Sequence, residues 1–134
     1  MTITRDIATR DDIAALMEAF YQQALRDPTI GYLFTDVAKM DLETHLPVIC
    51  DFWESLLFKS HSYHGNVMQK HILLHQQEAL TEAHFARWLA LFNATIDGLF
   101  SGPRADESKR RAASIATAIR TRITKPQQMF LSGG

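Results

Sequence analysis

Residues 81–103, TEAHFARWLALFNATIDGLFSGP, decide the fold class of this chain. Their large apolar side chains recur at the spacing of one helix face. These side chains are Phe85, Trp88, Leu89, Phe92, Ile96, Leu99 and Phe100. Thr81 followed by Glu82 is typical of a helix start, and Gly102-Pro103 is typical of a helix end. The stretch therefore predicts a long amphipathic helix with one face turned toward a hydrophobic core.

The same spacing occurs near the N-terminus. Apolar residues from Ile13 to Ala24 fall on one side of a second predicted helix. Thr9 and Asp11 are available to cap its start, and Asp27-Pro28 ends it. The N-terminal part of the chain is therefore also predicted to contain an amphipathic helix.

A third helix is predicted to begin at Asp41 or Thr44 and to run to about Phe58. Its inner side is expected to hold Leu42, His45, Leu46, Ile49, Phe52, Trp53 and Leu56. Proline donates no backbone hydrogen bond and disfavours helical geometry at the preceding residue. Pro47 therefore predicts that the regular helix begins only near His45.

The remaining segments complete a helical pattern. Residues 59–65 read as a loop, and 67–75 as a short helical segment. A last helix ends before Pro126, and the tail, 127–134, is expected to fray. No segment alternates with period two, so the chain is predicted to be all-α.

Composition limits the size and class of the protein. At 134 residues the chain is predicted to form one domain over 1–134, with a core of about 11–123. It is 46% hydrophobic with a formal charge of −1, which argues against disorder and against a nucleic-acid partner. The single cysteine, Cys50, excludes an internal disulfide and is predicted to be a buried thiol in a reducing cytoplasm.

No membrane partner is expected either. The most apolar stretch runs from Leu46 to Phe58 and is interrupted by the charged residues Asp51 and Glu54. A helix that crosses a bilayer needs roughly 20 consecutive apolar residues. This stretch is therefore predicted to pack inside the protein.

The histidines differ in their surroundings. His84 falls in the first turn of a helix and is expected to be solvent-exposed, as are His61 and His64 in a loop. His71 and His75 are four residues apart in a short apolar segment, so both imidazoles can share one helix face. A lone histidine in such company is most often a structural residue.

Hydrogen-bonding aromatic residues are spread over the predicted helices. Tyr21, His45 and Trp88 each lie on the inner side of a different helix, and His71 lies in the short segment between two of them. Each can be a core residue whose polar tip reaches a backbone carbonyl. Together they match the needs of a haem iron, which takes one imidazole on one side and hydrogen-bond donors on the other.

Several motifs in the same order resemble the third group of truncated haemoglobins. They are Phe20-Tyr21, Asp27-Pro28, Gly31-Tyr32-Leu33-Phe34, His45-Leu46-Pro47, Asp51-Phe52-Trp53, Tyr63-His64-Gly65-Asn66, Met68, His71 and residues 84–92. The resemblance extends from about Ile13 to Ala118. It implies a truncated globin in which a two-over-two helical sandwich encloses haem b.

The resemblance also implies roles for individual residues. His71 matches the proximal iron ligand, and Phe34 matches the aromatic that stacks on the porphyrin. Tyr21 and Trp88 match the distal hydrogen-bonding pair, and His45 matches the residue at the distal gate. Other residues expected to contact the haem are Ile49, Tyr63, Met68 and Phe92.

Three functions remain open at this level. The first is a cytoplasmic haem protein that binds dioxygen, nitric oxide or carbon monoxide and detoxifies by nitric oxide dioxygenation or peroxide chemistry, with a separate reductase. The second is a haem-based gas sensor that signals to a separate partner. The third is a helical domain that binds zinc through His61, His64, His71 and His75, although this spacing lacks the cysteines of a convincing zinc site.

Overall fold

The computed structural model describes residues 4–61 and 63–124. Its elements are α1 (Arg10–Ala24), η1 (Leu33–Val37), α2 (Leu42–Phe58), α3 (Val67–Gln77), α4 (Glu82–Leu99) and α5 (Pro103–Thr124). η1 is a short π-helix. The described residues form no strand, only an isolated bridge between Arg5 and Phe100. The predicted all-α class is confirmed, whereas the predicted fraying of 127–134 concerns residues outside the described ranges.

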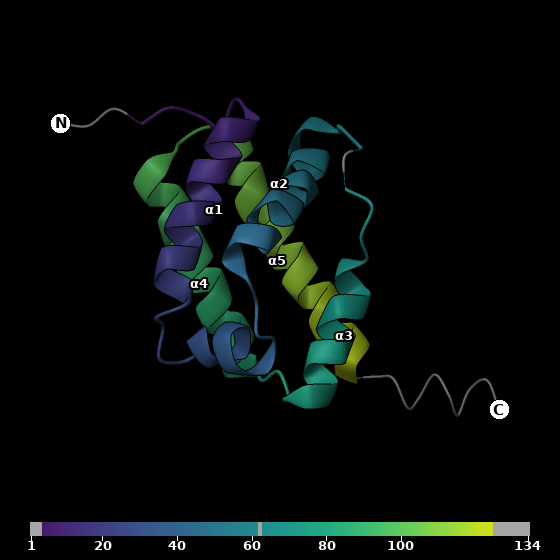
Figure 1. Cartoon of the computed structure of the whole chain (residues 1–134). Coiled ribbons are helices and arrows are strands. Elements are labelled where there is room, and N and C mark those ends of the chain that lie inside the picture. The colour runs from purple at the N-terminus through teal and green to yellow at the C-terminus, as the bar shows by residue number, and fades with distance from the viewer. Residues whose placement is uncertain (1–3, 62, 125–134) are drawn as a thin grey trace.

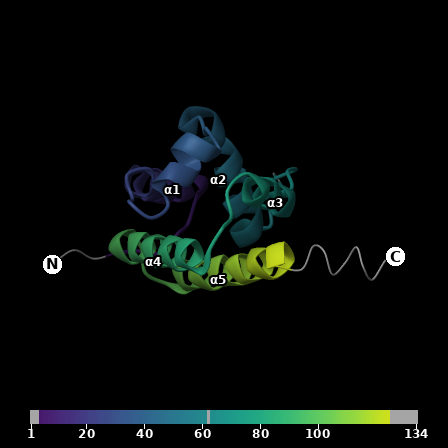
Figure 2. The same ribbon diagram turned by 90° about the horizontal axis from the view of Figure 1, so that it is seen from below.

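The helices form two layers. α4 and α5 lie side by side in one layer, and α1, α2 and α3 lie across them in the other (Figure 2). α1 packs against both α2 and α4, while α3 packs against α5 (Figure 1). No helix of the described part is both long and apolar enough to span a membrane.

Of the two candidate caps of α1, Thr9 and not Asp11 is the N-cap, and Thr81 caps α4 as predicted. Thr9 and Thr81 each accept a hydrogen bond from the third backbone N–H of their helix, and each belongs to a capping box. At the other end of α1, Asp27 accepts hydrogen bonds from the N–H groups of Thr29 and Ile30, 3.0 and 3.1 Å away. Local hydrogen bonds therefore fix the start of α1 and the turn that follows it.

The carboxylate of Asp27 also ties the turn after α1 to α4. It is buried, and its Oδ1 accepts a 2.7 Å hydrogen bond from Nε of Arg87. Burial by itself disfavours the charged carboxylate and raises the pKa of Asp27. The Arg87 guanidinium and the two backbone N–H groups stabilise the carboxylate by more, so the net effect is a lowered pKa of Asp27. The turn is thus held against the helix that carries Trp88.

The prediction that Pro47 delays the start of the regular helix to near His45 is wrong. α2 is regular from Leu42, with Asp41 at its N-cap. Proline is tolerated here because it lies close to the helix start on an exposed face, where only one helical hydrogen bond is lost. Arg10 of α1 donates to the Pro47 carbonyl at 3.2 Å and to Asp51 at 2.6 Å, which holds this part of α2 against α1.

On α4 the core follows most of the predicted face, whereas on α2 only Trp53 of the predicted inner residues is fully buried. Phe85, Phe92, Ile96 and Phe100 are buried on α4 or just after it, but Leu99 is 39% exposed. The burial of Ile96 and Phe100 orients the end of α4 and turns Leu99 to the edge. Cys50 is buried as expected.

Candidate functional site

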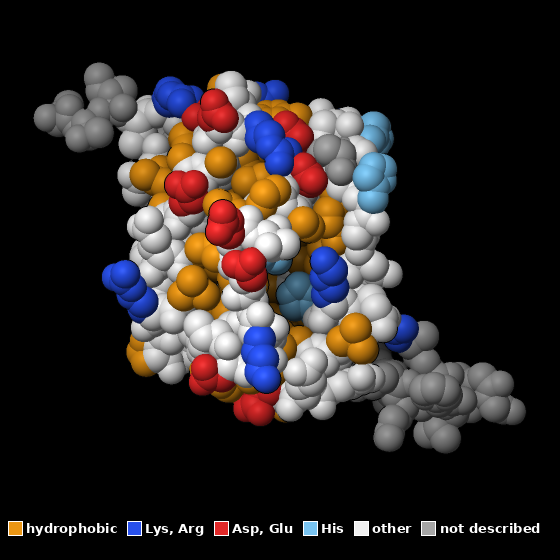
Figure 3. All heavy atoms as spheres, viewed as in Figure 1, with side chains coloured by type: hydrophobic (Ala, Val, Ile, Leu, Met, Phe, Trp, Pro, Cys, Tyr) orange, Lys and Arg blue, Asp and Glu red, His pale blue; other side chains and the backbone are white. Residues whose placement is uncertain are grey.

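A cavity of about 360 Å³ lies between the two helical layers. This volume is in the range of roughly 300–1,000 Å³ that is usual for cofactor and small-molecule sites. The predicted site residues that line it are Tyr21, Phe34, His45, Ile49, Tyr63, His71 and Trp88. Figure 3 shows its opening as a hollow in which histidine side chains are visible. The fold therefore brings together residues from α1, η1, α2, α3 and α4.

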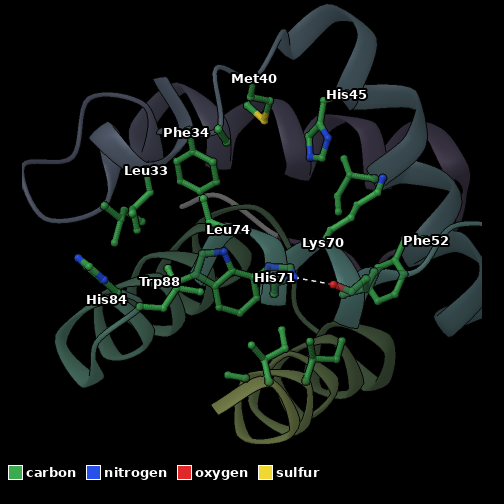
Figure 4. Close-up of a pocket in the computed structure, with 18 of the residues that line it drawn as sticks. Leu33, Phe34, Met40, His45, Phe52, Lys70, His71, Leu74, His84 and Trp88 are labelled. Carbon is green, nitrogen blue, oxygen red and sulfur yellow. Dashed lines mark hydrogen bonds between the residues drawn. The ribbon is translucent and has the colours of Figure 1, made fainter. Parts of the chain in front are cut away.

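His71 presents one nitrogen to this cavity. Its Nδ1–H donates to the backbone carbonyl of Val67 at 2.8 Å, the bond drawn as a dashed line in Figure 4. A carbonyl only accepts, so Nδ1 carries the hydrogen and Nε2 of the neutral ring keeps its lone pair. Burial lowers the pKa of His71 and keeps the ring neutral. This is the protonation state and orientation that a metal-binding imidazole requires.

His75 is held elsewhere. Its Nδ1 accepts the backbone N–H of Leu80 at 3.0 Å, and the residue does not line the cavity. The four-residue spacing from His71 therefore does not bring both imidazoles to the same site. His71 is the histidine of α3 that is placed to bind a ligand in the cavity.

Tyr21 and His45 form a pair within the cavity wall. The Tyr21 hydroxyl and Nε2 of His45 are 3.1 Å apart, and Figure 4 shows His45 pointing from α2 into the cavity. Desolvation raises the pKa of the Tyr21 phenol. Desolvation, followed by the charges of Lys70 and His71, lowers the pKa of His45. Both groups are therefore neutral at neutral pH, and the tautomer of His45 decides which of them donates.

Trp88 is oriented by aromatic rings behind it. Its ring is stacked on that of Phe92, with centroids 5.2 Å apart and planes 5° apart. Phe20 meets both Trp88 and Tyr21 edge-on, at 6.0 and 5.2 Å. These arrangements are favourable for aromatic pairs and fix the rings that face the cavity.

Two residues expected to contact a cofactor lie outside the cavity lining. Phe92 is 1% exposed and packs in the core behind Trp88. Met68 packs against a separate buried cluster that includes Phe85 and Ile119. Both lie on the expected helices, but Phe92 is buried in the core and the partly buried Met68 packs against the second cluster.

His84 is not solvent-exposed, contrary to the sequence-based expectation. It is half-buried and lines the cavity, and it occupies the third position of α4 in the capping box of Thr81. A Glu or Gln usually fills this position. The usual sequence pattern of a capping box is absent here because His84 replaces the Glu or Gln. A capping box with histidine at this position predicts an ordered His84 side chain.

Lys70 was not identified from the sequence. It directly precedes His71 and lines both the cavity and a second hollow at its mouth, together with Met40, His45 and Val48. The available signal in the sequence was the position of Lys70, a cation directly beside the candidate ligand His71.

The residues of the proposed zinc site do not converge. His61 and His64 are exposed, while His71 and His75 hydrogen-bond to different backbone groups. Within residues 4–61 and 63–124, no three His, Cys, Asp or Glu side chains are grouped closely enough to hold a metal ion. The described histidines that line the cavity, His45, His71 and His84, are therefore separate imidazoles and do not form a cage of metal ligands.

Comparisons with known proteins agree with this architecture. No family model matches the chain. A curated relative, group 3 truncated hemoglobin ctb of Campylobacter jejuni, is 25% identical over 119 residues, which are 87% of this chain and 91% of the relative. The crystal structure of group III truncated hemoglobin from Campylobacter jejuni superposes with a TM-score of 0.79 and 23% identity, over 90% of this chain and 95% of that one. The chain therefore has the fold of a truncated globin, and its sequence is similar to that of a group 3 truncated hemoglobin.

Proposed function

We propose that the chain binds haem b in this cavity through His71 and uses Tyr21 and Trp88 to hold a small ligand on the other side. The observation that carries the proposal is the 2.8 Å hydrogen bond from Nδ1 of His71 to the Val67 carbonyl. That bond leaves the Nε2 lone pair of a neutral ring available within an apolar cavity. When bound, haem supplies an iron with an open coordination position for a diatomic molecule.

The rest of the lining suits a flat, mostly apolar group with a charged edge. Phe34, Ile49 and Tyr63 provide apolar walls. Lys70 at the mouth offers an ammonium group for a haem propionate while its stem covers apolar surface. The donor set and the wall chemistry therefore fit the proposed cofactor.

The polar groups of the cavity favour retention of the ligand over rapid exchange. The phenol of Tyr21 and the indole N–H of Trp88 are donors, and a hydrogen bond to a charged group contributes about 1.5–3 kcal/mol. A transport protein needs fast release. We therefore propose redox detoxification in the cytoplasm, either oxidation of nitric oxide to nitrate or reduction of peroxide, with electrons from a separate reductase.

The first test is the binding of haem itself. Titration of haemin into the purified apoprotein is expected to give a Soret band that saturates at one haem per chain, because the described part of the cavity presents one suitable imidazole. Absorbance spectroscopy with parallel elemental analysis measures both haem and zinc. A colourless protein that carries stoichiometric zinc would contradict the proposal.

His45 is expected to control access to the cavity. Its Nε2 is engaged by the Tyr21 hydroxyl, and its side chain lies at the mouth beside Lys70. The variant His45→Ala removes this bulk, so carbon monoxide should associate faster with the ferrous protein while the ferrous spectrum stays unchanged. Flash photolysis measures the rate. A wild-type spectrum with two histidine ligands that disappears in His45→Ala would show that His45 is an iron ligand.

A further inference from the structure

A second polar cluster lies at the end of the cavity away from His45. It consists of Tyr32, just before η1, Glu78, just after α3, and His84 of α4. Figure 4 shows His84 at the opposite end of the lining from His45. Tyr32 does not line the cavity itself, but its ring centroid is 5.8 Å from that of His84, which does. The tyrosine is therefore one ring away from the cavity.

The direction of each hydrogen bond in this cluster can be assigned. The backbone N–H of Thr81 donates to Nδ1 of His84 at 3.1 Å, so Nδ1 carries no hydrogen. In the neutral ring the hydrogen is then on Nε2, which donates to the Tyr32 oxygen at 3.1 Å. The Tyr32 hydroxyl is left to donate to Oε2 of Glu78, also at 3.1 Å. Tyr32 thus has both a proton acceptor and a donor that holds its oxygen.

We propose that Tyr32 is a surface oxidation site through which small phenolic reductants deliver electrons to an oxidant in the cavity. The proposal rests on the proposed haem function, with hydrogen peroxide as the oxidant. A tyrosine that loses an electron must also lose its hydroxyl proton, and the Glu78 carboxylate is placed to accept it. The Nε2–H of His84 then stabilises the oxygen of the resulting phenoxyl radical.

The electrons and protons balance over two equal steps. In each step Tyr32 gives up one electron and passes its proton to Glu78. A phenol at the surface returns a hydrogen atom to the Tyr32 oxygen, and Glu78 releases the proton it took. Two electrons and two protons convert one hydrogen peroxide into two water molecules, and two phenols leave as phenoxyl radicals.

The other tyrosines lack this combination. Tyr21 is 5% exposed, and its hydroxyl partner is His45, so no donor from the surface reaches it. Among the described residues, no carboxylate accepts a hydrogen bond from the hydroxyl of Tyr63, which lines the cavity. Glu78 is exposed and Tyr32 is half-exposed, so a small molecule can reach their hydrogen-bonded edge. The negative charge of Glu78 favours neutral phenols over anionic reductants.

The test uses the haem-loaded protein, one equivalent of hydrogen peroxide and a nitroso spin trap, with guaiacol as the phenol in a parallel assay. Peptide mass spectrometry is expected to place the trap adduct on Tyr32 in the wild type. The adduct and guaiacol oxidation should both be lost in Tyr32→Phe. Glu78→Gln keeps a hydrogen-bond acceptor but removes the base, so both signals should fall there as well.

Glu82→Gln is the matched control, because it neutralises a nearby carboxylate that pairs with Arg120 instead. Its adduct yield should equal that of the wild type. An adduct that forms mainly on Tyr21 or Tyr63, with guaiacol oxidation unchanged in Tyr32→Phe, would overturn the inference. A protein that shows no Soret band after haem addition would instead overturn the proposed function, so the two failures are distinguishable.

Discussion

Alanine in place of His71 is expected to weaken haem binding greatly. His71 alone among the histidines of α3 lines the cavity, and its Nδ1–H bond to Val67 aims the Nε2 lone pair away from the backbone. Loss even of residues that merely orient a metal ligand weakens metal sites about 10- to 100-fold. Removal of the ligand itself should therefore weaken haem affinity by on the order of a hundredfold or more. Haem transfer to apomyoglobin, followed by absorbance, measures the loss.

Added imidazole offers a second readout for His71→Ala, since it can occupy the space of the missing side chain and restore a five- or six-coordinate spectrum. His75→Ala is the matched control. It removes an acceptor for the Leu80 N–H, which costs about 1 kcal/mol of stability but leaves the cavity unchanged. If His75→Ala lost haem while His71→Ala kept it, the assignment of the ligand would be wrong by one helical turn.

Oxygen release is expected to speed up about tenfold or more in each of Tyr21→Phe and Trp88→Phe, the effect of losing about 1.4 kcal/mol of hydrogen bonding. Each substitution removes one donor and keeps an aromatic ring. The stacking of Phe92 and the edge contacts of Phe20 favour a ring that stays in place. Both donors serve one ligand, so the double variant need not show the product of the two effects.

Stopped-flow displacement of oxygen by carbon monoxide measures these rates. Tyr32→Phe is the matched control, because it removes a phenolic hydroxyl that does not line the cavity. Its oxygen dissociation rate should equal that of the wild type. If the wild type released oxygen as fast as both single variants, the proposal that Tyr21 and Trp88 retain bound oxygen would be wrong. A sensor or carrier role would then replace detoxification.

Helix positions were largely predictable, because helix starts and ends depend on neighbours in the sequence. Thr9 and Thr81 cap the helices that they were expected to cap. α4 ends at Leu99, shortly before Gly102-Pro103 as predicted, and Pro103 is the first residue of α5. The prediction at Pro47 failed because the free-energy cost of a proline in a helix depends on tertiary structure. The hydrogen bond lost at Pro47 lies on an exposed face, and Arg10, which is distant in the sequence, donates to the Pro47 carbonyl.

The all-α class and the positions of Tyr21, His45, His71 and Trp88 on amphipathic helices follow from the residue pattern alone. Which side chains face the cavity depends on how the helices pack. Phe92 is buried in the core, Met68 packs against the second cluster, His84 lines the cavity, and His75 accepts a hydrogen bond from the backbone. Hydrophobic periodicity defines only a broad helix face. The final rotation of each helix within that face is set by close packing against partners from other parts of the chain.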